Sequence, residues 1–141
     1  MQERLRRCLA MRTPLPPVAV VLSFIDRINR SDLSGLLELM TGDHQLIFPG
    51  EAPIEGRAAN ERAWRGYMAS FPHYVIHPGR LVSTGDRVAV LGATTGSHLA
   101  LPDDEELKLT LIWLATVRAG KLAVWELRDD TPAQRSEWRL S

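Results

Sequence analysis

The order of the secondary-structure signals along this chain most constrains what it can fold into. Apolar residues recur at helical spacing in the first half, whereas the second half holds long runs of Val, Leu, Ile and Trp joined by tight turns. The sharpest turns lie at residues 84–87 and 118–121, and each contains a glycine. This order predicts an α+β domain in which a curved antiparallel sheet packs on helices and leaves room for a ligand between them.

Three helices are predicted from residues 18–30, 33–40 and 57–71. The first follows a proline-rich segment, and proline is tolerated in the first turn of a helix because its missing N–H has no partner there. The second begins after Asp32, a good N-cap residue, and ends at Gly42.

The strands are predicted at residues 44–48, 74–83, 87–98, 107–118 and 121–128. The last four follow one another through short connections, so we expect them to form an antiparallel meander. A cluster of four carboxylates, residues 103–106, lies between two of these strands. It lacks the ligand spacing and central glycine of a calcium-binding loop, so we expect a solvated loop and no metal.

Length and composition indicate one domain. A chain of 141 residues with 45% hydrophobic content can bury a substantial core without a metal or disulfide. We predict the domain at residues 14–132, with a flexible N-terminal extension at 1–13 and a C-terminal tail at 133–141. Met11 is an alternative start, and the only cysteine, Cys8, has no partner in the chain, which suits a reducing cytoplasm.

Charge argues against two classes of partner. The 17 basic and 17 acidic side chains cancel, so no overall field attracts nucleic acid or an anionic membrane. No run of apolar residues approaches the length needed to cross a bilayer. We therefore expect a cytoplasmic protein that has no nucleic-acid or membrane partner.

Several stretches of the chain resemble the SnoaL-like branch of the NTF2-like superfamily, which also contains ketosteroid isomerase, limonene epoxide hydrolase and polyketide cyclases. The likeness runs from about residue 18 to residue 132. It is carried by residues 24–29 (FIDRIN), 39–44 (LMTGDH), 54–57 (IEGR), 85–90 (GDRVAV), 95–98 (TGSH) and 118–125 (RAGKLAVW).

The resemblance implies a cone in which three N-terminal helices close a curved antiparallel sheet around a pocket, commonly as a homodimer joined through the outer sheet face. It also shows where this chain departs from its relatives. Apolar Phe24, Phe48 and Leu127 stand at positions where relatives carry a tyrosine or a carboxylate that handles protons. The resemblance therefore implies the fold and a ligand pocket, but no catalytic group at these positions.

His44 is the first candidate for acid/base chemistry. Strand alternation places it on the same face as Leu46 and Phe48, so it could reach the cavity with Asp43 nearby. The alternative is a structural corner at which Asp43 and His44 cap backbone groups.

Six aromatic side chains are candidates for a ligand-binding box, and the same residues could equally be ordinary core. They are Phe24, Phe48, Trp64, Tyr67, Trp113 and Trp125. Tyr67 adds the hydroxyl of this box and could donate to a ligand carbonyl. By alternation Leu127 and Asp129 share a face with Trp125, which would place Asp129 at the cavity mouth or at a solvated strand end. His73, His77 and His98 are expected at the surface.

We expect this domain to bind a small hydrophobic or aromatic molecule, without a cofactor, and to act on it as an isomerase, cyclase or dehydratase through His44, Tyr67 and Asp129. The apolar residues at positions 24, 48 and 127 favour a second possibility, a non-catalytic binding or dimerisation module. A third is an accessory domain that binds a protein partner through its sheet face.

Overall fold

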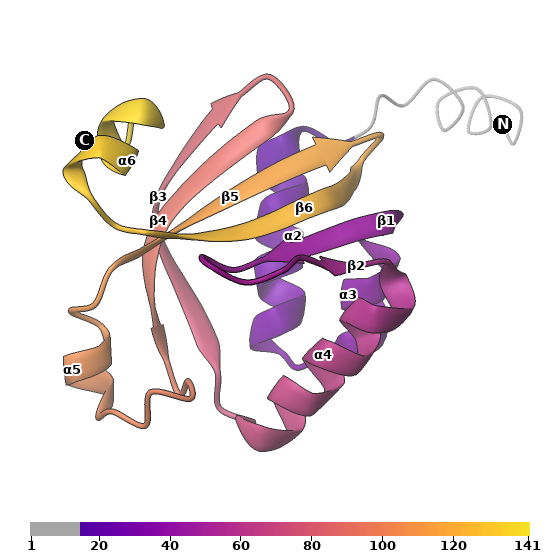
Figure 1. The fold of residues 1–141 in the computed structure, drawn as a ribbon, viewed down its shortest axis with the longest axis horizontal. Coiled ribbons are helices and arrows are strands. Elements are labelled where there is room, and N and C mark those ends of the chain that lie inside the picture. Colours follow the sequence, from indigo (N-terminus) through magenta and orange to yellow (C-terminus); the bar gives the residue numbers. More distant parts are fainter. Residues whose placement is uncertain (1–14) are drawn as a thin grey trace, which may run out of the picture.

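The computed structural model describes residues 15–141, and the predicted N-terminal extension lies outside them. Helix α2 spans Pro17–Asn29 and begins with a proline in its first turn. Its buried residues recur every three or four positions and form one continuous apolar stripe. They are Val20, Val21, Phe24, Ile25 and Ile28. The helix packs through this stripe against one face of the sheet (Figure 1).

Helix α3 (Leu33–Glu38) is shorter than predicted because strand β1 (Met40–Ile47) starts earlier than expected. The Asp32 side chain caps α3 by accepting a hydrogen bond from the Gly35 N–H at 3.0 Å. Met40 already pairs with Leu122, and the Leu122 N–H donates to the Leu39 carbonyl at 2.7 Å. This long-range pairing converts the last predicted turn of helix into strand.

Strand β2 (Ile54–Glu55) is a two-residue edge strand, and helix α4 (Arg57–Ser70) follows it directly. Asn60 fixes the start of α4, because its buried Nδ2 donates to the carbonyls of His44, Ile54 and Gly56 at 2.9–3.2 Å. This amide therefore joins β1, β2 and α4 in one network.

Strands β3 (Val75–Thr84), β4 (Arg87–Thr95), β5 (Leu111–Arg118) and β6 (Lys121–Asp129) form the predicted antiparallel meander. Both predicted turns are present, with positive φ at Gly85 and at Ala119 and Gly120. The sheet order is β2-β1-β6-β5-β4-β3, and β1 runs parallel to β6. The α+β prediction is thus confirmed, with a mixed sheet in place of a purely antiparallel one.

Two short helices were not predicted. Helix α5 (Asp103–Glu106) forms within the expected loop, and the strands on either side are shorter than expected, since β4 stops at Thr95 and β5 starts at Leu111. Helix α6 (Pro132–Glu137) forms where we expected a tail, and Thr131 caps it. Arg135 bonds Asp130 at 2.6 and 2.7 Å, and Leu140 is buried. The end of the chain is held because apolar residues there cover the outer sheet face.

The sheet has helices on both faces, but not equally. Helices α2, α3 and α4 lie on the inner face with the main core, and α6 lies on the other face over β4 and β5 (Figure 1). Among residues 15–141, no helix has both the length and the apolar character needed to span a membrane.

Candidate functional site

A cavity of about 450 Å³ lies between the inner sheet face and helix α4. Its apolar lining comes from strands β1, β2, β5 and β6, and its polar lining comes from α4 and from the strand and loop segments at the same end of the sheet. The main apolar residues are Leu46, Phe48, Ile54, Trp113, Trp125 and Leu127. The polar residues are Glu51, Tyr67, Tyr74, Thr94, Ser97 and His98. An apolar chamber with polar groups gathered in one part is the usual form of a small-molecule site.

The indoles of Trp113 and Trp125 form one wall of this cavity. Their ring centroids are 6.1 Å apart and their planes differ by 18°. In the β5–β6 register Trp113 pairs with Leu127 and Ala115 pairs with Trp125, so the two indoles are diagonal neighbours on one face. Two parallel aromatic planes can accept a flat ring by stacking.

Helix α4 supplies the opposite wall. Trp64 and Tyr67 both line the cavity and meet edge to face, with their centroids 6.4 Å apart. The Trp64 Nε1 donor is buried and has no hydrogen-bond partner within residues 15–141. A buried donor without a partner carries a cost in stability.

Tyr67 and His98 form a polar pair at the edge of the cavity. The Tyr67 hydroxyl lies 2.9 Å from His98 Nδ1 and accepts a hydrogen bond from the His98 backbone N–H at 3.3 Å. Burial raises the pKa of Tyr67, the backbone N–H lowers it and the Glu106 charge raises it. Because the net direction is upward, the hydroxyl stays protonated near neutral pH and can donate but not act as a base.

His44 does not line the cavity, in contrast to our expectation. Its side chain is completely buried, with Nδ1 2.7 Å from the Leu122 carbonyl and its ring 5.9 Å from that of Phe24. Because the carbonyl needs a donor, Nδ1 carries the proton. His44 does lie on the expected sheet face, but near the end that helix α2 covers.

Phe24 and Asp129 also lie outside the cavity lining. Phe24 is fully buried in the core, with its ring 5.2 Å from that of Trp125. Asp129 is exposed at the end of β6, which corresponds to the solvated alternative. Of the predicted residues, the structure brings Phe48, Trp64, Tyr67, Trp113, Trp125 and Leu127 together around one space.

The buried state of His44 predicts a pH-dependent stability. Burial is the main cause that lowers its pKa from 6.5, against smaller raising effects of the Leu122 carbonyl and Asp43. As the pH falls through 6.5, His44 therefore takes up a proton in the unfolded chain but stays neutral in the folded protein. This stabilisation is present above that pH and is lost as the pH falls below it.

The unaltered protein should have a lower free energy of unfolding at pH 5.5 than at pH 7.5. In His44→Asn, which keeps a donor for the carbonyl, we expect this loss to be smaller by about 1 kcal/mol. Urea unfolding at both pH values measures this loss. The exposed His73, replaced in the same way, is the matched control and should leave the loss unchanged. An unaltered loss in His44→Asn would show that this imidazole is not held neutral.

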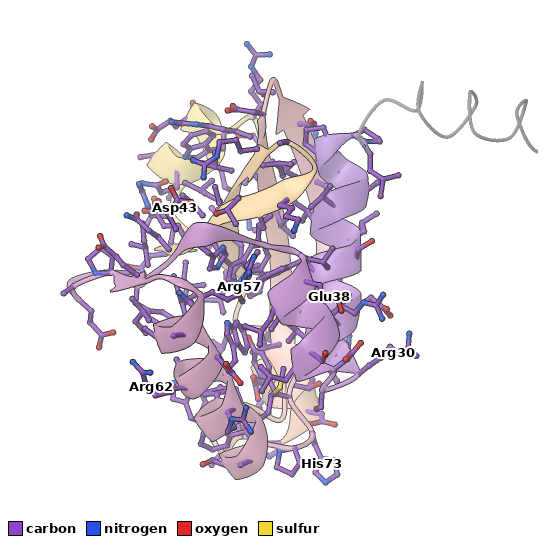
Figure 2. All side chains as sticks on the ribbon, turned by 90° about the vertical axis from the view of Figure 1, so that its right-hand side faces the viewer. Arg30, Glu38, Asp43, Arg57, Arg62 and His73 are labelled. Carbon is purple, nitrogen blue, oxygen red and sulfur yellow. The ribbon has the colours of Figure 1, made fainter. Side chains whose placement is uncertain are left out.

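A larger depression of about 590 Å³ lies between α3 and α4, but it is open to solvent and lined mainly by charged side chains. Glu38 and Arg57 mark it on the face shown in Figure 2. Arg57 donates to the Met40 carbonyl at 2.7 Å, and Arg65 pairs with Glu61. Arg57, Glu61 and Arg65 thus already have partners, and the other cavity is more enclosed and more apolar, so we place the candidate site there.

Sequence reasoning missed Tyr74, Thr94, Ser97 and His98 as lining residues. Tyr74 precedes β3, and the other three lie where β4 ends early before α5. The sequence did not indicate that β4 ends at Thr95, and the strand was expected to continue to residue 98. Gly96, with φ of 68°, marks the point at which the chain turns there.

Comparisons with known proteins agree with this architecture. The family model described as a SnoaL-like domain matches residues 21–125. Searching the curated proteins finds no match. Many solved structures are similar to this chain.

Three of these similar structures serve as examples. A suggested polyketide cyclase from Sinorhizobium meliloti is 24% identical, with a TM-score of 0.67 over 81% of this chain and 95% of that one. IdmH, another suggested polyketide cyclase, from Streptomyces antibioticus, is 23% identical, with a TM-score of 0.65 over 82% and 93%. TerC, co-crystallised with polyporic acid, is 21% identical, with a TM-score of 0.65 over 90% and 100%. At these identities the likeness establishes the fold.

Proposed function

Because this chain belongs to the SnoaL-like domain family, we propose that it binds a small hydrophobic, ring-containing molecule in the cavity between α4 and the sheet. The observation that carries the proposal is a partly enclosed space of about 450 Å³ whose lining includes Trp64, Trp113 and Trp125. Fully packed aromatic core would leave no such space. The co-crystallisation of TerC with polyporic acid supports ligand binding by a protein of this fold.

The chemistry that fits this cavity is general acid catalysis, as in an isomerase, cyclase or dehydratase. Tyr67 is the proposed proton donor to a ligand oxygen, because its hydroxyl stays protonated and lies on the cavity wall. His98 Nδ1, at 2.9 Å, is placed to return a proton to the tyrosine oxygen. The two similar structures assigned as polyketide cyclases support this reaction class.

A non-catalytic binding module is the second candidate. Its support is the apolar character of the deep cavity, where Phe48 and Leu127 stand beside the paired indoles. Neither side chain can transfer a proton. In that case Tyr67 and His98 would orient a ligand without turnover. The homodimer and the cytoplasmic location expected from the sequence stay predictions.

Ligand binding is tested with 2-acetylnaphthalene as a probe, by equilibrium dialysis with absorbance detection. We expect saturable binding with a ratio of one probe per chain. Ala63→Phe should weaken it at least tenfold, because Ala63 lines the cavity and the added ring fills the space. Ala69→Phe adds the same ring at an exposed position of the same helix and should leave binding unchanged. No binding to the unaltered protein, or equal effects of both variants, would contradict the proposal.

A further inference from the structure

A buried carboxylate, Glu106, lies close to the cavity but is not one of its lining residues. Glu106 belongs to the acidic segment predicted to be a solvated loop, and its neighbours Asp103, Asp104 and Glu105 are indeed exposed. Glu106 itself is only 1% exposed. Taking a carboxylate out of water costs several kcal/mol unless other groups compensate it. A residue buried at this cost needs a structural or functional explanation.

Both oxygens of Glu106 accept hydrogen bonds. The Thr94 hydroxyl donates to Oε2, and the Ser97 backbone N–H donates to Oε1 at 3.4 Å. These two hydrogen bonds offset part of the cost of removing the side chain from water. Yet Glu106 is in none of the ion pairs found among residues 15–141. Its charge is therefore neutralised by no cationic side chain there.

The charge acts on the ligand cavity. Thr94 and Ser97, which bond Glu106, themselves line the cavity, so the carboxylate lies directly behind this wall. Its effect reaches the tyrosines: burial is the main cause that raises the pKa of both Tyr67 and Tyr74, and the Glu106 charge raises each further. A field that opposes a phenolate at these positions also opposes a ligand anion there.

Donors are nevertheless gathered in the same part of the cavity. The Ser97 hydroxyl oxygen accepts a hydrogen bond from the Leu99 N–H at 3.2 Å, which leaves its own proton available. Tyr67, on the same wall, carries a second hydroxyl proton. Donors call for an acceptor oxygen on the ligand, and the field of Glu106 requires that this oxygen be uncharged.

We propose that Glu106 is a specificity-determining residue, which makes the polar wall formed by Tyr67 and Ser97 bind a neutral carbonyl oxygen and reject a carboxylate. This inference rests on the proposed function, because it assumes that the cavity binds a ring-containing molecule. It adds the class of ligand: a cyclic ketone, aldehyde or quinone-like compound in preference to an aromatic acid.

Three probes that share one ring system test the inference at pH 7.5. They are a neutral ketone (2-acetylnaphthalene), a carboxylate (2-naphthoate) and a cation (protonated 2-(aminomethyl)naphthalene). We expect the unaltered protein to bind the ketone at least tenfold more tightly than the carboxylate. The cation should also bind more tightly than the carboxylate. Since both ions must lose water, that second comparison isolates the sign of the field from the cost of desolvation.

Glu106→Gln keeps the shape of the side chain and removes its charge. We expect it to raise the affinity for 2-naphthoate about tenfold, to reduce the preference for the cation over the carboxylate and to change the affinity for the ketone less than threefold. Glu105→Gln removes an exposed charge from the adjacent position of α5 and should change none of these values. Circular dichroism checks that both variants fold.

The outcomes separate the two proposals. Binding of the ketone together with equal binding of the two ions, or an unchanged preference in Glu106→Gln, overturns the inference and leaves the proposed function standing. Absence of binding by all three probes removes the proposed function and this inference with it. The comparison of the two ions in the unaltered protein decides the question even if Glu106→Gln does not fold.

Discussion

Phe24→Ala is expected to lower the free energy of unfolding by about 3–5 kcal/mol, the range for removing a fully buried aromatic ring. Phe24 has no exposed surface and packs against Trp125 on the sheet and His44 on β1. Interiors are close-packed, so the surrounding side chains can fill the space only in part. Chemical unfolding in urea, monitored by tryptophan fluorescence, measures the loss.

Phe48→Ala is the matched control, because it deletes the same ring at a place that already borders the cavity. Phe48 is only partly buried. Its removal would enlarge an existing space and create no sealed void, so we expect a cost of about 1–2 kcal/mol. Equal losses for the two variants would contradict our assignment of Phe24 to the core and Phe48 to the cavity wall.

Asn60→Ala is expected to lower the free energy of unfolding by about 2–3 kcal/mol. The buried amide donates to three carbonyls, those of His44, Ile54 and Gly56. Buried acceptors left without a donor cost about 1–3 kcal/mol each, although two of these carbonyls also accept backbone N–H groups. The loss should be accompanied by faster hydrogen exchange at the start of α4, which this amide holds against β1 and β2.

Asn60→Asp separates the hydrogen bonds from the packing, because it keeps the shape of the side chain. At neutral pH it replaces the donor with an oxygen that faces carbonyl oxygens, so it should destabilise at least as much as Asn60→Ala. Below pH 4 a protonated carboxyl could donate again, and the deficit relative to the unaltered protein should narrow. A neutral-pH stability equal to that of the unaltered protein would show that the amide network contributes nothing.

Helices and strands were predictable where one periodic pattern continues undisturbed. The stripe of α2 follows from its spacing alone, and the β3–β6 meander follows from alternating apolar runs with glycine turns. The start of β1 was not predictable, because Met40 becomes strand through pairing with Leu122 more than eighty positions away. Helix α6 escaped prediction because its burial depends on an apolar outer sheet face that local sequence does not reveal.

Residues of the site were predictable to the extent that alternation and helical spacing specify a face. Trp113, Trp125 and Leu127 were expected on one face, and the register brings them together there. Alternation does not specify which part of a sheet face is covered by the helices. His44 shares its face with Leu46 and Phe48, yet α2 seals it into the core through Phe24.

The chain by itself thus determined that an amphipathic helical layer covers a sheet with an aromatic inner face, because hydrophobic spacing is a local property. Only the tertiary structure decided that Glu106 is buried while its acidic neighbours are exposed, and that Tyr67 meets His98 across 31 positions. Whether a polar group lies in water, in core or on a cavity wall depends on contacts between distant segments. No local pattern contains that information.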